Sequence, residues 1–500
     1  MLRPFTQITI QQITPFTVNG ISISRSSKFT LDFNTEYIVD TGWEKHTDNC
    51  TLKFPKNINL FGTPDGIFTY NPNFGLILGA TGTQQSPNID AFGTPITYSP
   101  LIMKGDIITI NDGYLFRNSK GVENYCGTGN VIYPFTNTIN QNNAISSPYT
   151  FNKFFGYISE VKSGTPIEIK CEDNFYLLKR TPFPKSVWNK TESGSTGTSL
   201  YGLMNYILSI VNKNYNQVNS LYPELTLLDV PTSITAQFAL GYLEIGDLTC
   251  GQLLDKLKQQ YHLESTFRGN VLQFGFPIYQ DQLGQEGSAN SNNFFCFRDI
   301  YNSSGNLLAS ANIFPSHDLD YKNKEDIILS ATVQCKVINS VQGKSTLSGE
   351  QKTKVEKLKV YVYWDIVSQS FKSQNLSQGQ TTSTEVPANI DGGERHEFYY
   401  PVDKSNPSPS ISQLEQYGKD HLRLYHYTGF RGCFTSFGYP FVQWNDNVNI
   451  LDPIYSDRNG QYKVKKVVYK GGLKGLSQEI HLDYKINVPL PANINTYQLM

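Results

Sequence analysis

The chain has 500 residues and a mass of 56.4 kDa, enough for about three or four domains of ordinary size. Its 42 Lys and Arg residues nearly balance its 43 Asp and Glu residues, and the formal net charge is −1. This balance argues against a general phosphate-binding protein, which usually carries a basic surplus, and against an acidic disordered protein. The 31 Tyr and 30 Phe residues favour strands, while the 39 Gly and 25 Pro residues supply turns, so the composition predicts a mostly-β protein.

The cysteines predict reduced thiols rather than a disulfide framework or a zinc site. Their number is odd, their spacing is wide and no C-x-x-C pair occurs. Such thiols fit assembly in a reducing cytoplasm. The first ten residues contain no apolar run suited to a signal peptide, and no stretch approaches the roughly 18 apolar residues of a membrane span. We therefore expect a soluble, untargeted protein. The cysteines are Cys50, Cys126, Cys171, Cys250, Cys296, Cys335 and Cys433.

The first part of the chain, over residues 16–179, reads as short strands separated by loops rich in Gly, Asn and Pro. A strand over 104–110 is entered from a Gly-Asp turn, and two more strands are expected over 154–158 and 167–171. Short strands with frequent turn signals predict a barrel or a sandwich.

The middle of the chain changes character after a Ser/Thr/Gly-rich linker at 185–198. Apolar residues at helical spacing predict a helix over 200–211. A second helix is expected over 249–261, where a Thr and a Gln three residues later have the spacing of a capping box. The following segment, 263–276, reads as a β-hairpin. These pieces predict a small α/β unit.

The last part of the chain combines strands with one helix. A half-buried strand is predicted over 358–364, and the Ser/Gln/Thr/Gly-rich stretch 367–393 reads as a long loop or mobile insertion. A helix is expected over 411–425. Like the first β region, this one has a late Gly-containing turn into a strand, which suggests that the two regions share a shape. The remaining predicted strands cover 327–337, 430–436, 448–450, 461–469 and 478–484.

No motif for catalysis or metal binding passes the test of context. The seven histidines include no H-E-x-x-H, and His421 and His426 are five residues apart, off a common helix face. Neither a G-x-S-x-G elbow nor a P-loop occurs. The Gly-rich segment 194–197 lies in the linker, and 471–475 is better explained as a hairpin turn.

Paired carboxylates are the remaining route to an enzyme. A glycosidase needs an acid and a base about 5–9 Å apart in a cleft, whereas short acidic turns are commoner. We therefore expect no catalytic, cofactor-binding or metal-binding residues. The carboxylates considered are Glu172, Asp173, Asp446, Asp452 and Asp457.

The Lys- and Tyr-rich run over 462–470 admits two interpretations. Its alternation predicts a β-strand with one solvated face, which puts Tyr462 and Val464 on one side and Val467 and Tyr469 on the other. A nucleic-acid-binding stripe is the alternative, and the balanced charge of the chain argues against it.

Taken in order, these segments resemble bacteriophage tail hub (baseplate hub) proteins, the group that includes the late control protein D family. The match begins with the Gly-Asp turn, strand and Gly-Tyr of 104–114, followed by the Phe-Gly-Tyr-Ile of 155–158 and the strand ending in an acidic turn at 166–173. The helix and hairpin of 248–276 follow, and the chain closes with a Gly-x-Tyr-x-Val … Gln-x-Ile-x-Leu hairpin over 460–482. A departure from the family pattern is Asn445-Asp446-Asn447, where the family usually has Gly-Asp.

The resemblance implies a mostly-β (α+β) fold, with tandem β-barrel domains, an intervening small α/β domain and a C-terminal helix before the last strands. The expected domains are a first β-barrel over 1–184, a linker over 185–198, an α/β domain over 199–278 and a second β-barrel formed by 279–365 with 394–500. The stretch 366–393 is the polar loop or insertion.

The expected function is that of a non-enzymatic structural protein of the virion, in the phage tail, assembled in the cytoplasm of a bacterial host. The resemblance implies self-association into a ring, a trimer or a hexamer, that joins the tail tube or portal side to distal tail proteins. DNA would pass through this ring without specific binding, and no cofactor or membrane span is expected. The alternative is a tail-associated glycan-binding or glycan-degrading β protein.

Overall fold

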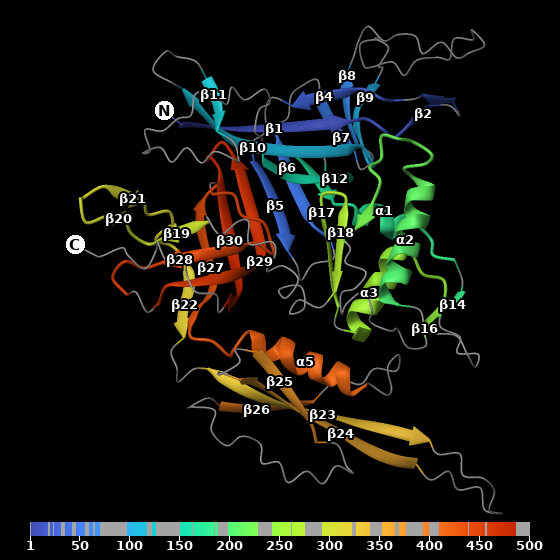
Figure 1. The fold of residues 1–500 in the computed structure, drawn as a ribbon. Coiled ribbons are helices and arrows are strands. Elements are labelled where there is room, and N and C mark those ends of the chain that lie inside the picture. The colour runs from blue at the N-terminus through green and yellow to red at the C-terminus, as the bar shows by residue number, and fades with distance from the viewer. Residues whose placement is uncertain are drawn as a thin grey trace, which may run out of the picture.

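The fold is described from a computed structural model (Figure 1). Large parts of both β regions, the α/β unit and the helix before the last strands are covered. The described residues are 2–18, 21–23, 25–31, 36–42, 47–55, 60–63, 66–70, 98–117, 123–126, 151–162, 164–184, 186–188, 199–228, 243–261, 263–275, 293–322, 327–340, 353–365, 370–376, 394–399, 410–438, 440–455 and 458–486.

A 14-stranded, mostly antiparallel sheet dominates the molecule, and its strands come from both ends of the chain. Its main path runs in the order β22-β27-β30-β29-β5-β6-β13-β12-β10-β1-β4, with β11, β19 and β28 attached to the side. In chain order these strands are β1 (Leu2–Gln11), β4 (Lys28–Leu31), β5 (Glu36–Gly42), β6 (Asn49–Phe54), β10 (Ile107–Arg117), β11 (Glu123–Cys126), β12 (Phe151–Lys162), β13 (Ile167–Glu172), β19 (Phe294–Cys296), β22 (Asp318–Lys322), β27 (Gly429–Phe437), β28 (Asn447–Leu451), β29 (Gly460–Gly472) and β30 (Ser477–Ile486).

One hydrophobic core serves both ends of the chain. It joins Ile8 and Leu52 of the first β region to Val467 and Ile480 of the last one. Each of these side chains is at most 1% exposed. Both β regions therefore fold onto a shared core rather than onto two separate ones.

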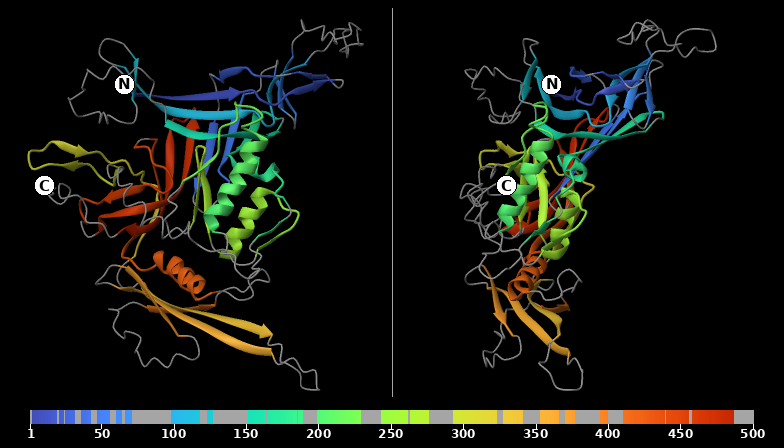
Figure 2. Two further views of the ribbon diagram at one scale, coloured as in Figure 1. Left: turned by 45° about the vertical axis from the view of Figure 1, so that its right-hand side comes forward. Right: turned by 90° about the vertical axis from the view of Figure 1, so that its right-hand side faces the viewer.

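An α/β unit packs beside this sheet. It contains helices α1 (Phe175–Arg180), α2 (Leu200–Asn214) and α3 (Cys250–Tyr261), and its own buried core. A three-stranded sheet of β15 (Thr226–Leu227), β18 (Val271–Gly275) and β17 (Glu264–Arg268) packs with them, and β14 (Ser186–Trp188) pairs with β16 (Leu243–Ile245). Figure 2 shows α2 and α3 side by side on one flank of the molecule.

A separate four-stranded sheet carries the last helix. Strands β25 (Ser370–Asn375), β24 (Thr353–Asp365), β23 (Ile328–Ser340) and β26 (Glu394–Tyr399) form it in that order. Helix α5 (Ile411–Arg423) buries Leu414 and Leu422 against it, and lies between this sheet and the rest of the molecule (Figures 1 and 2). Smaller sheets pair β2 (Phe16–Val18) with β3 (Ile21–Ile23), β20 (Ile300–Tyr301) with β21 (Leu307–Ala309), and β7 (Leu60–Thr63) with β8 (Gly66–Tyr70) and β9 (Tyr98–Met103).

Several local predictions are confirmed. The three predicted helices correspond to α2, α3 and α5, and the hairpin of the α/β unit is β17–β18. The predicted capping box at the start of α3 is present, because Gln252 N donates to Thr249 Oγ1 at 3.2 Å and Thr249 N donates to Gln252 Oε1 at 2.9 Å. A mostly-β fold with few helices is also confirmed.

Two expectations need correction. Among the described strands no closed barrel is found, since the main path of the large sheet is open between β22 and β4. The sheet instead continues from one β region into the other, a pairing between distant segments that local patterns do not reveal. In addition, part of the stretch predicted as a polar loop, Ser370–Asn375, is strand β25, while 377–393 lies outside the described residues.

The strand over the Lys- and Tyr-rich run is confirmed as β29, but its simple alternation is wrong. The register of β29 against β30 shifts between Val464 and Lys466. A β-bulge adds one residue and inverts the alternation beyond it. As a result Tyr462, Val464, Val467 and Tyr469 all enter the same core.

Candidate functional site: a repeated strand unit and the cavity at its seam

A buried carboxylate closes the turn that precedes β10. Gly105 has a φ of +93°, which favours glycine. Asp106 is fully buried, and its Oδ1 accepts from the backbone N–H groups of Ile13 at 3.0 Å and Thr14 at 3.1 Å. Its Oδ2 accepts from Arg25 Nη2 at 2.8 Å, in a pair where Arg25 is also buried. The Gly-Asp motif therefore has a structural role: it ties the turn before β10 to the segment that contains Ile13 and Thr14 and to Arg25.

The same kind of Asp-centred turn recurs before β28, 340 positions later along the chain. Asn445 has a φ of 67° and takes the place of Gly105, which is feasible because Asn tolerates the left-handed region. Asp446 Oδ2 accepts from the backbone N–H of Gln443 at 2.8 Å, as Asp106 Oδ2 accepts from that of Met103 at 2.8 Å. The departure from the family motif therefore preserves the backbone geometry of the turn.

Each turn is also hydrogen-bonded to a later strand of its own unit, β12 in the first unit and β29 in the second. Gly105 N donates to Ile158 O at 2.8 Å, and Ile158 N donates to Asp106 O at 3.0 Å. The corresponding bonds join Asn445 N to Val464 O at 2.7 Å and Val464 N to Asp446 O at 3.0 Å. This match makes Ile158 of β12 equivalent to Val464 of β29.

The strands around the two turns follow the same order. In the first unit the order is β5-β6-β13-β12-β10, and in the second it is β22-β27-β30-β29-β28. A bulge follows Ile158 where β12 pairs with β13, and another follows Val464 where β29 pairs with β30. The suggestion that the two β regions share a shape is therefore confirmed strand by strand. The likeness ends at the flanking strands, because β1 is antiparallel to β10 whereas β19 is parallel to β28.

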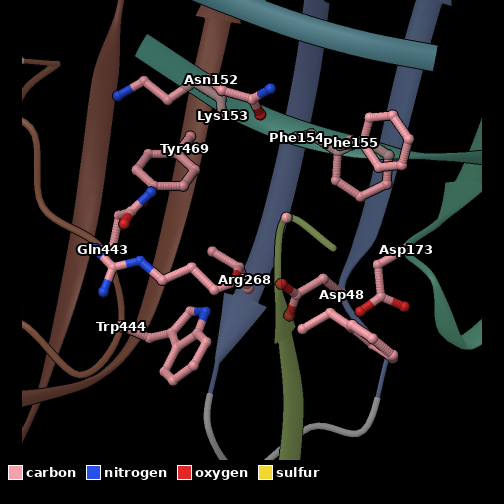
Figure 3. Close-up of a pocket in the computed structure, with 13 residues that line it drawn as sticks. Asp48, Asn152, Lys153, Phe154, Phe155, Asp173, Arg268, Gln443, Trp444 and Tyr469 are labelled. Carbon is pink, nitrogen blue, oxygen red and sulfur yellow. Dashed lines mark hydrogen bonds between the residues drawn. The ribbon is translucent and has the colours of Figure 1, made fainter. Parts of the chain in front are cut away.

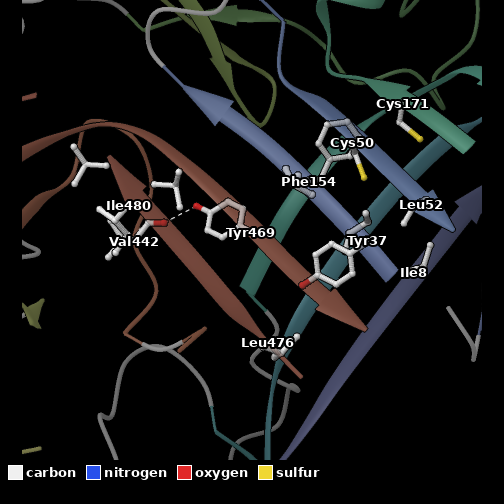
Figure 4. Packing of buried hydrophobic residues seen from close by; sticks show 14 of the residues in the cluster. Ile8, Tyr37, Cys50, Leu52, Phe154, Cys171, Val442, Tyr469, Leu476 and Ile480 are labelled. Atoms are coloured by element: carbon white, nitrogen blue, oxygen red, sulfur yellow. Dashed lines mark hydrogen bonds between the residues drawn. The ribbon is translucent and has the colours of Figure 1, made fainter. Parts of the chain in front are cut away.

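The two units meet at a seam, where β29 pairs with β5 from Lys466↔Gly42 to Gly472↔Glu36. Tyr37 and Tyr469 are buried at this seam, and Figure 4 shows them on adjoining strands with Cys50, Leu52 and Ile8 beyond. The Tyr37 hydroxyl donates to Asp112 of β10, and the Tyr469 hydroxyl donates to the backbone oxygen of Val442. These two bonds connect the strands of the seam to elements on either side of it.

Lys153 and Asp112 form a buried ion pair near the seam, with 3.5 Å between Nζ and Oδ1. Burial lowers the pKa of Lys153 to about 8 and raises the pKa of Asp112, while each charge opposes the shift of the other. The Lys153 ammonium also lies 3.8 Å from the ring centre of Phe441 and 4.4 Å from that of Tyr469. The cation thus has a carboxylate and two aromatic faces as partners.

A cavity of about 270 Å³ opens where the two units meet the α/β unit. Arg268, at the end of β17, extends toward Gln443 and Trp444 on one wall, while Asp48 and Asp173 lie on the other (Figure 3). The Arg268 guanidinium is 3.5 Å from Asp446. Arg268 thus faces the second buried turn, as Arg25 faces the first.

Asp48 and Asp173 are the acidic groups of this cavity. Asp48 accepts from Thr41 Oγ1 at 2.6 Å and from Gly42 N at 3.1 Å. Asp173 Oδ1 accepts from the backbone N–H of Phe175 at 3.0 Å, while Oδ2 has no hydrogen-bond partner among the described residues. Burial and the nearby Asp48 charge raise the pKa of Asp173. Both carboxylates therefore anchor backbone or side-chain groups at the start of α1 and the end of β5.

The other carboxylates considered from the sequence also have structural partners. Glu172 pairs with Lys179 at 2.8 Å. Asp452 accepts from the backbone N–H groups of Ile454 and Tyr455, which makes it a turn residue. Asp457 lies outside the described residues. The structure brings Asp173 and Asp446 to the region of one cavity but leaves Glu172 and Asp452 elsewhere.

The remaining motifs have equally local explanations. The Gly-rich segment 471–475 is the predicted hairpin turn, where Gly475 N donates to Gly472 O at 3.0 Å. His426 is buried, and burial lowers its pKa to about 4. The segment 194–197 lies outside the described residues. Sequence reasoning missed Arg25, Arg268 and Lys153, because no local pattern marks a cation whose carboxylate lies 41 to 178 positions away.

No protein-family model matches this sequence. A match to a curated protein covers 107 residues at 29% identity: an imidazole-4-carboxamide isomerase of the phosphoribosyl type from Pelagibacter ubique. It spans 21% of this chain and 41% of that relative. A local match of this extent does not carry the isomerase activity to this chain.

Comparison with solved structures gives matches along nearly the whole chain. One is the tail protein from Neisseria meningitidis, with 10% identity, 97% of both chains covered and a TM-score of 0.43. Another is the 43 kDa tail protein of prophage MuSo2 from Shewanella oneidensis, with 9% identity, 96% and 98% covered, and a TM-score of 0.40. Both of these structures are tail proteins. A chain of the Francisella PdpA–VgrG complex matches at 12% identity and a TM-score of 0.42, over 97% of this chain and 59% of that one.

Tail proteins are the class that the ordered sequence motifs resemble. Among the described residues, none of the helices is long and apolar enough to cross a membrane.

Proposed function

We propose that this chain is a structural, non-enzymatic subunit of a phage tail, a hub whose copies close into a ring around the passage for DNA. The observation that carries the proposal is the internal repeat. Two strand units with the same order and the same Asp-centred turn give one chain two equivalent positions in a ring. Three chains would then supply six such positions, in agreement with the ordered hub-like motifs of the sequence.

Free sheet edges support assembly. Strand β22 pairs with β27 on one side, and no described strand pairs with its other side. On the side of β12 away from β13, no described strand pairs with the segment Glu160–Lys162. Unpaired edges of this kind invite pairing with another chain. The near-neutral net charge of −1 fits a wall past which DNA moves without tight binding.

The seam within the chain predicts the contact between chains. Through the repeat, Lys466 of β29 is equivalent to Glu160 of β12, and Gly42 of β5 is equivalent to Lys322 of β22. If β12 of one copy pairs with β22 of the next as β29 pairs with β5, then Glu160 faces Lys322. Lys162 then faces Asp320. Opposite charges directly across an antiparallel pair stabilise it.

A charge reversal with rescue tests this assembly. The variant Asp320→Lys places a lysine opposite Lys162, and Lys162→Glu in the same protein restores an opposite pair. Each pair contributes roughly 0.5 kcal/mol, so three contacts per ring predict about a tenfold weaker assembly for the single variant and recovery in the double variant. Lys213→Glu, at an exposed position of α2, is the matched control. Assembly that Asp320→Lys leaves unchanged, or that the double variant fails to recover, would contradict this contact.

The glycan-degrading alternative has one specific observation in its favour, the Asp173 carboxyl with its raised pKa, which lines the same cavity as Trp444. A carboxyl of that kind could serve as a general acid. Hydrolysis of bacterial glycans by the purified protein, abolished in Asp173→Asn, would establish this alternative and overturn the non-enzymatic assignment. The structural bonds of Asp48 and Asp173 lead us to expect no hydrolysis.

A further inference from the structure

Cross-strand pairing brings a thiol, an imidazole and a carboxylate together on one face of the second unit. Cys433 of β27 lies directly opposite His481 of β30, and Glu479 precedes His481 by two residues on the same face. Their ligand atoms all lie within 4.8 Å of one another, and each side chain is half-buried. The His481 Nε2 and Glu479 Oε1 atoms are 2.9 Å apart.

A fourth donor stands on the edge strand. Asp318 of β22 is the direct partner of Cys433, and its Oδ2 lies 4.0 Å from Sγ. The row Asp318–Cys433–His481 thus crosses three strands at one level. Asp318 is exposed, and Cys433 and His481 are half-buried, so an ion can reach the row from solvent.

The charges around the cluster suit a cation. The carboxylates of Glu479 and Asp318 lie close to the Cys433 thiol, so a cation placed among these groups would relieve the repulsion between a thiolate and the carboxylates. Two lysines border the cluster: Lys466 pairs with Asp40 at 3.2 Å, outside the cluster, and Lys470 pairs with the Oε2 atom of Glu479 at 2.9 Å. The Oε1 atom of Glu479 is left facing the cluster.

The first unit provides an internal comparison. Through the repeat, Thr51 is equivalent to Cys433, Lys170 to His481 and Glu168 to Glu479. The first unit holds ordinary ion pairs there, Lys170–Glu160 at 2.8 Å and Lys162–Glu168 at 3.1 Å. The thiol and the imidazole are therefore specific to the second unit and are not required by the strand fold, whereas the carboxylate is common to both units.

We propose that Cys433, Glu479 and His481, with Asp318 as the fourth ligand, form a binding site for a zinc-class divalent cation. One thiolate, one imidazole and two carboxylates are a donor set suited to tetrahedral Zn²⁺. Ligand atoms around such an ion stand roughly 3.3–3.8 Å apart, given Zn–S of about 2.3 Å and Zn–N and Zn–O of about 2.0–2.2 Å. Bringing the ligand atoms of Cys433, Glu479 and His481 from within 4.8 Å of one another to this spacing requires side-chain rotations, and Asp318, which lies outside that group, must rotate toward it as well. The ion would link the edge strand β22 to β30 across β27. This stabilising role goes beyond the proposed hub function.

The test measures metal binding by the full-length, reduced protein. We expect one Zn²⁺ per chain in competition with a chromophoric chelator, and a thiolate-to-metal absorption band with Co²⁺. Cys433→Ser and His481→Asn should each weaken Zn²⁺ binding at least about 100-fold, more than loss of an outer partner does, and Cys433→Ser should abolish the Co²⁺ band. Asp318→Asn should weaken binding at least about tenfold.

Glu168→Gln, at the equivalent position of the first unit, is the matched control and should bind Zn²⁺ like the parent protein. Binding that survives both Cys433→Ser and His481→Asn would overturn the site, and so would a natively folded parent protein that binds no Zn²⁺. Unchanged binding in Asp318→Asn would overturn the assignment of the fourth ligand. Because ring formation is measured separately, loss of the metal site and failure of the hub proposal are distinguishable.

Discussion

The two Asp-centred turns make a sharp prediction, because equivalent substitutions should differ in cost. In Asp106→Asn the remaining carbonyl oxygen can still accept from the N–H groups of Ile13 and Thr14. In the parent protein, Asp106 Oδ2 accepts from Met103 N at 2.8 Å and from Arg25 Nη2 at 2.8 Å. In the variant, the amide NH₂ group takes the place of Oδ2. Donors would then face donors.

The magnitude follows from burial. The side chains of Arg25 and Asp106 are 5% and 0% exposed, and removing one partner of a buried pair costs about 3–5 kcal/mol because the other charge stays buried. In Asp446→Asn the partner, Arg268, is 40% exposed and 3.5 Å away. We expect a loss of about 1–2 kcal/mol there, from a weak ion pair and one backbone hydrogen bond.

Denaturant unfolding of both variants and the parent protein, followed by circular dichroism and tryptophan fluorescence, measures the difference in the free energy of unfolding. Asp446→Asn should unfold at a slightly lower denaturant concentration than the parent protein, and Asp106→Asn at a clearly lower one. Equal losses in the two variants, or an Asp106→Asn loss below about 1 kcal/mol, would refute the reasoning from burial.

Three further predictions concern the seam, the second turn and the last helix. Gly471→Ala would place a Cβ against the ring of Tyr37 and should lower the free energy of unfolding by about 1–3 kcal/mol, measured against the parent protein by denaturant unfolding. Asn445→Ala should cost about 1 kcal/mol, because φ is 67° there, whereas Asn445→Gly should cost little; equal effects would contradict this. Burial lowers the pKa of His426 to about 4 from 6.5, so its stabilising contribution is present above pH 6.5 and is lost as pH falls toward 4. The loss reaches about 3 kcal/mol, and His426→Asn should flatten the pH dependence of thermal unfolding between these values.

Sequence patterns predicted what depends on neighbours along the chain. The helices α2, α3 and α5 follow from apolar spacing, and the capping box of α3 from a Thr and a Gln three residues apart. The turn at Gly105 and the hairpin turn at 471–475 follow from the need for positive φ. These signals act within a few residues, so they can be recognised from the sequence alone.

What the patterns missed depends on pairing between distant segments. The bulge after Val464 moves Val467 and Tyr469 into the core, and alternation alone gives no sign of it. The pairing of β29 with β5 joins segments more than 420 positions apart. The Cys433–Glu479–His481 cluster was not predicted from the sequence for the same reason, since its members come together only when β27 and β30 pair in register.

The central claim is that two equivalent strand units in each chain allow copies of the chain to close into a ring. The most direct measurement is the native mass of the purified protein over a range of concentrations, with particle imaging of the assemblies. The account predicts closed rings with a whole number of chains, three if each chain supplies two of six positions. A monomer at every concentration, or open filaments without closure, would contradict it.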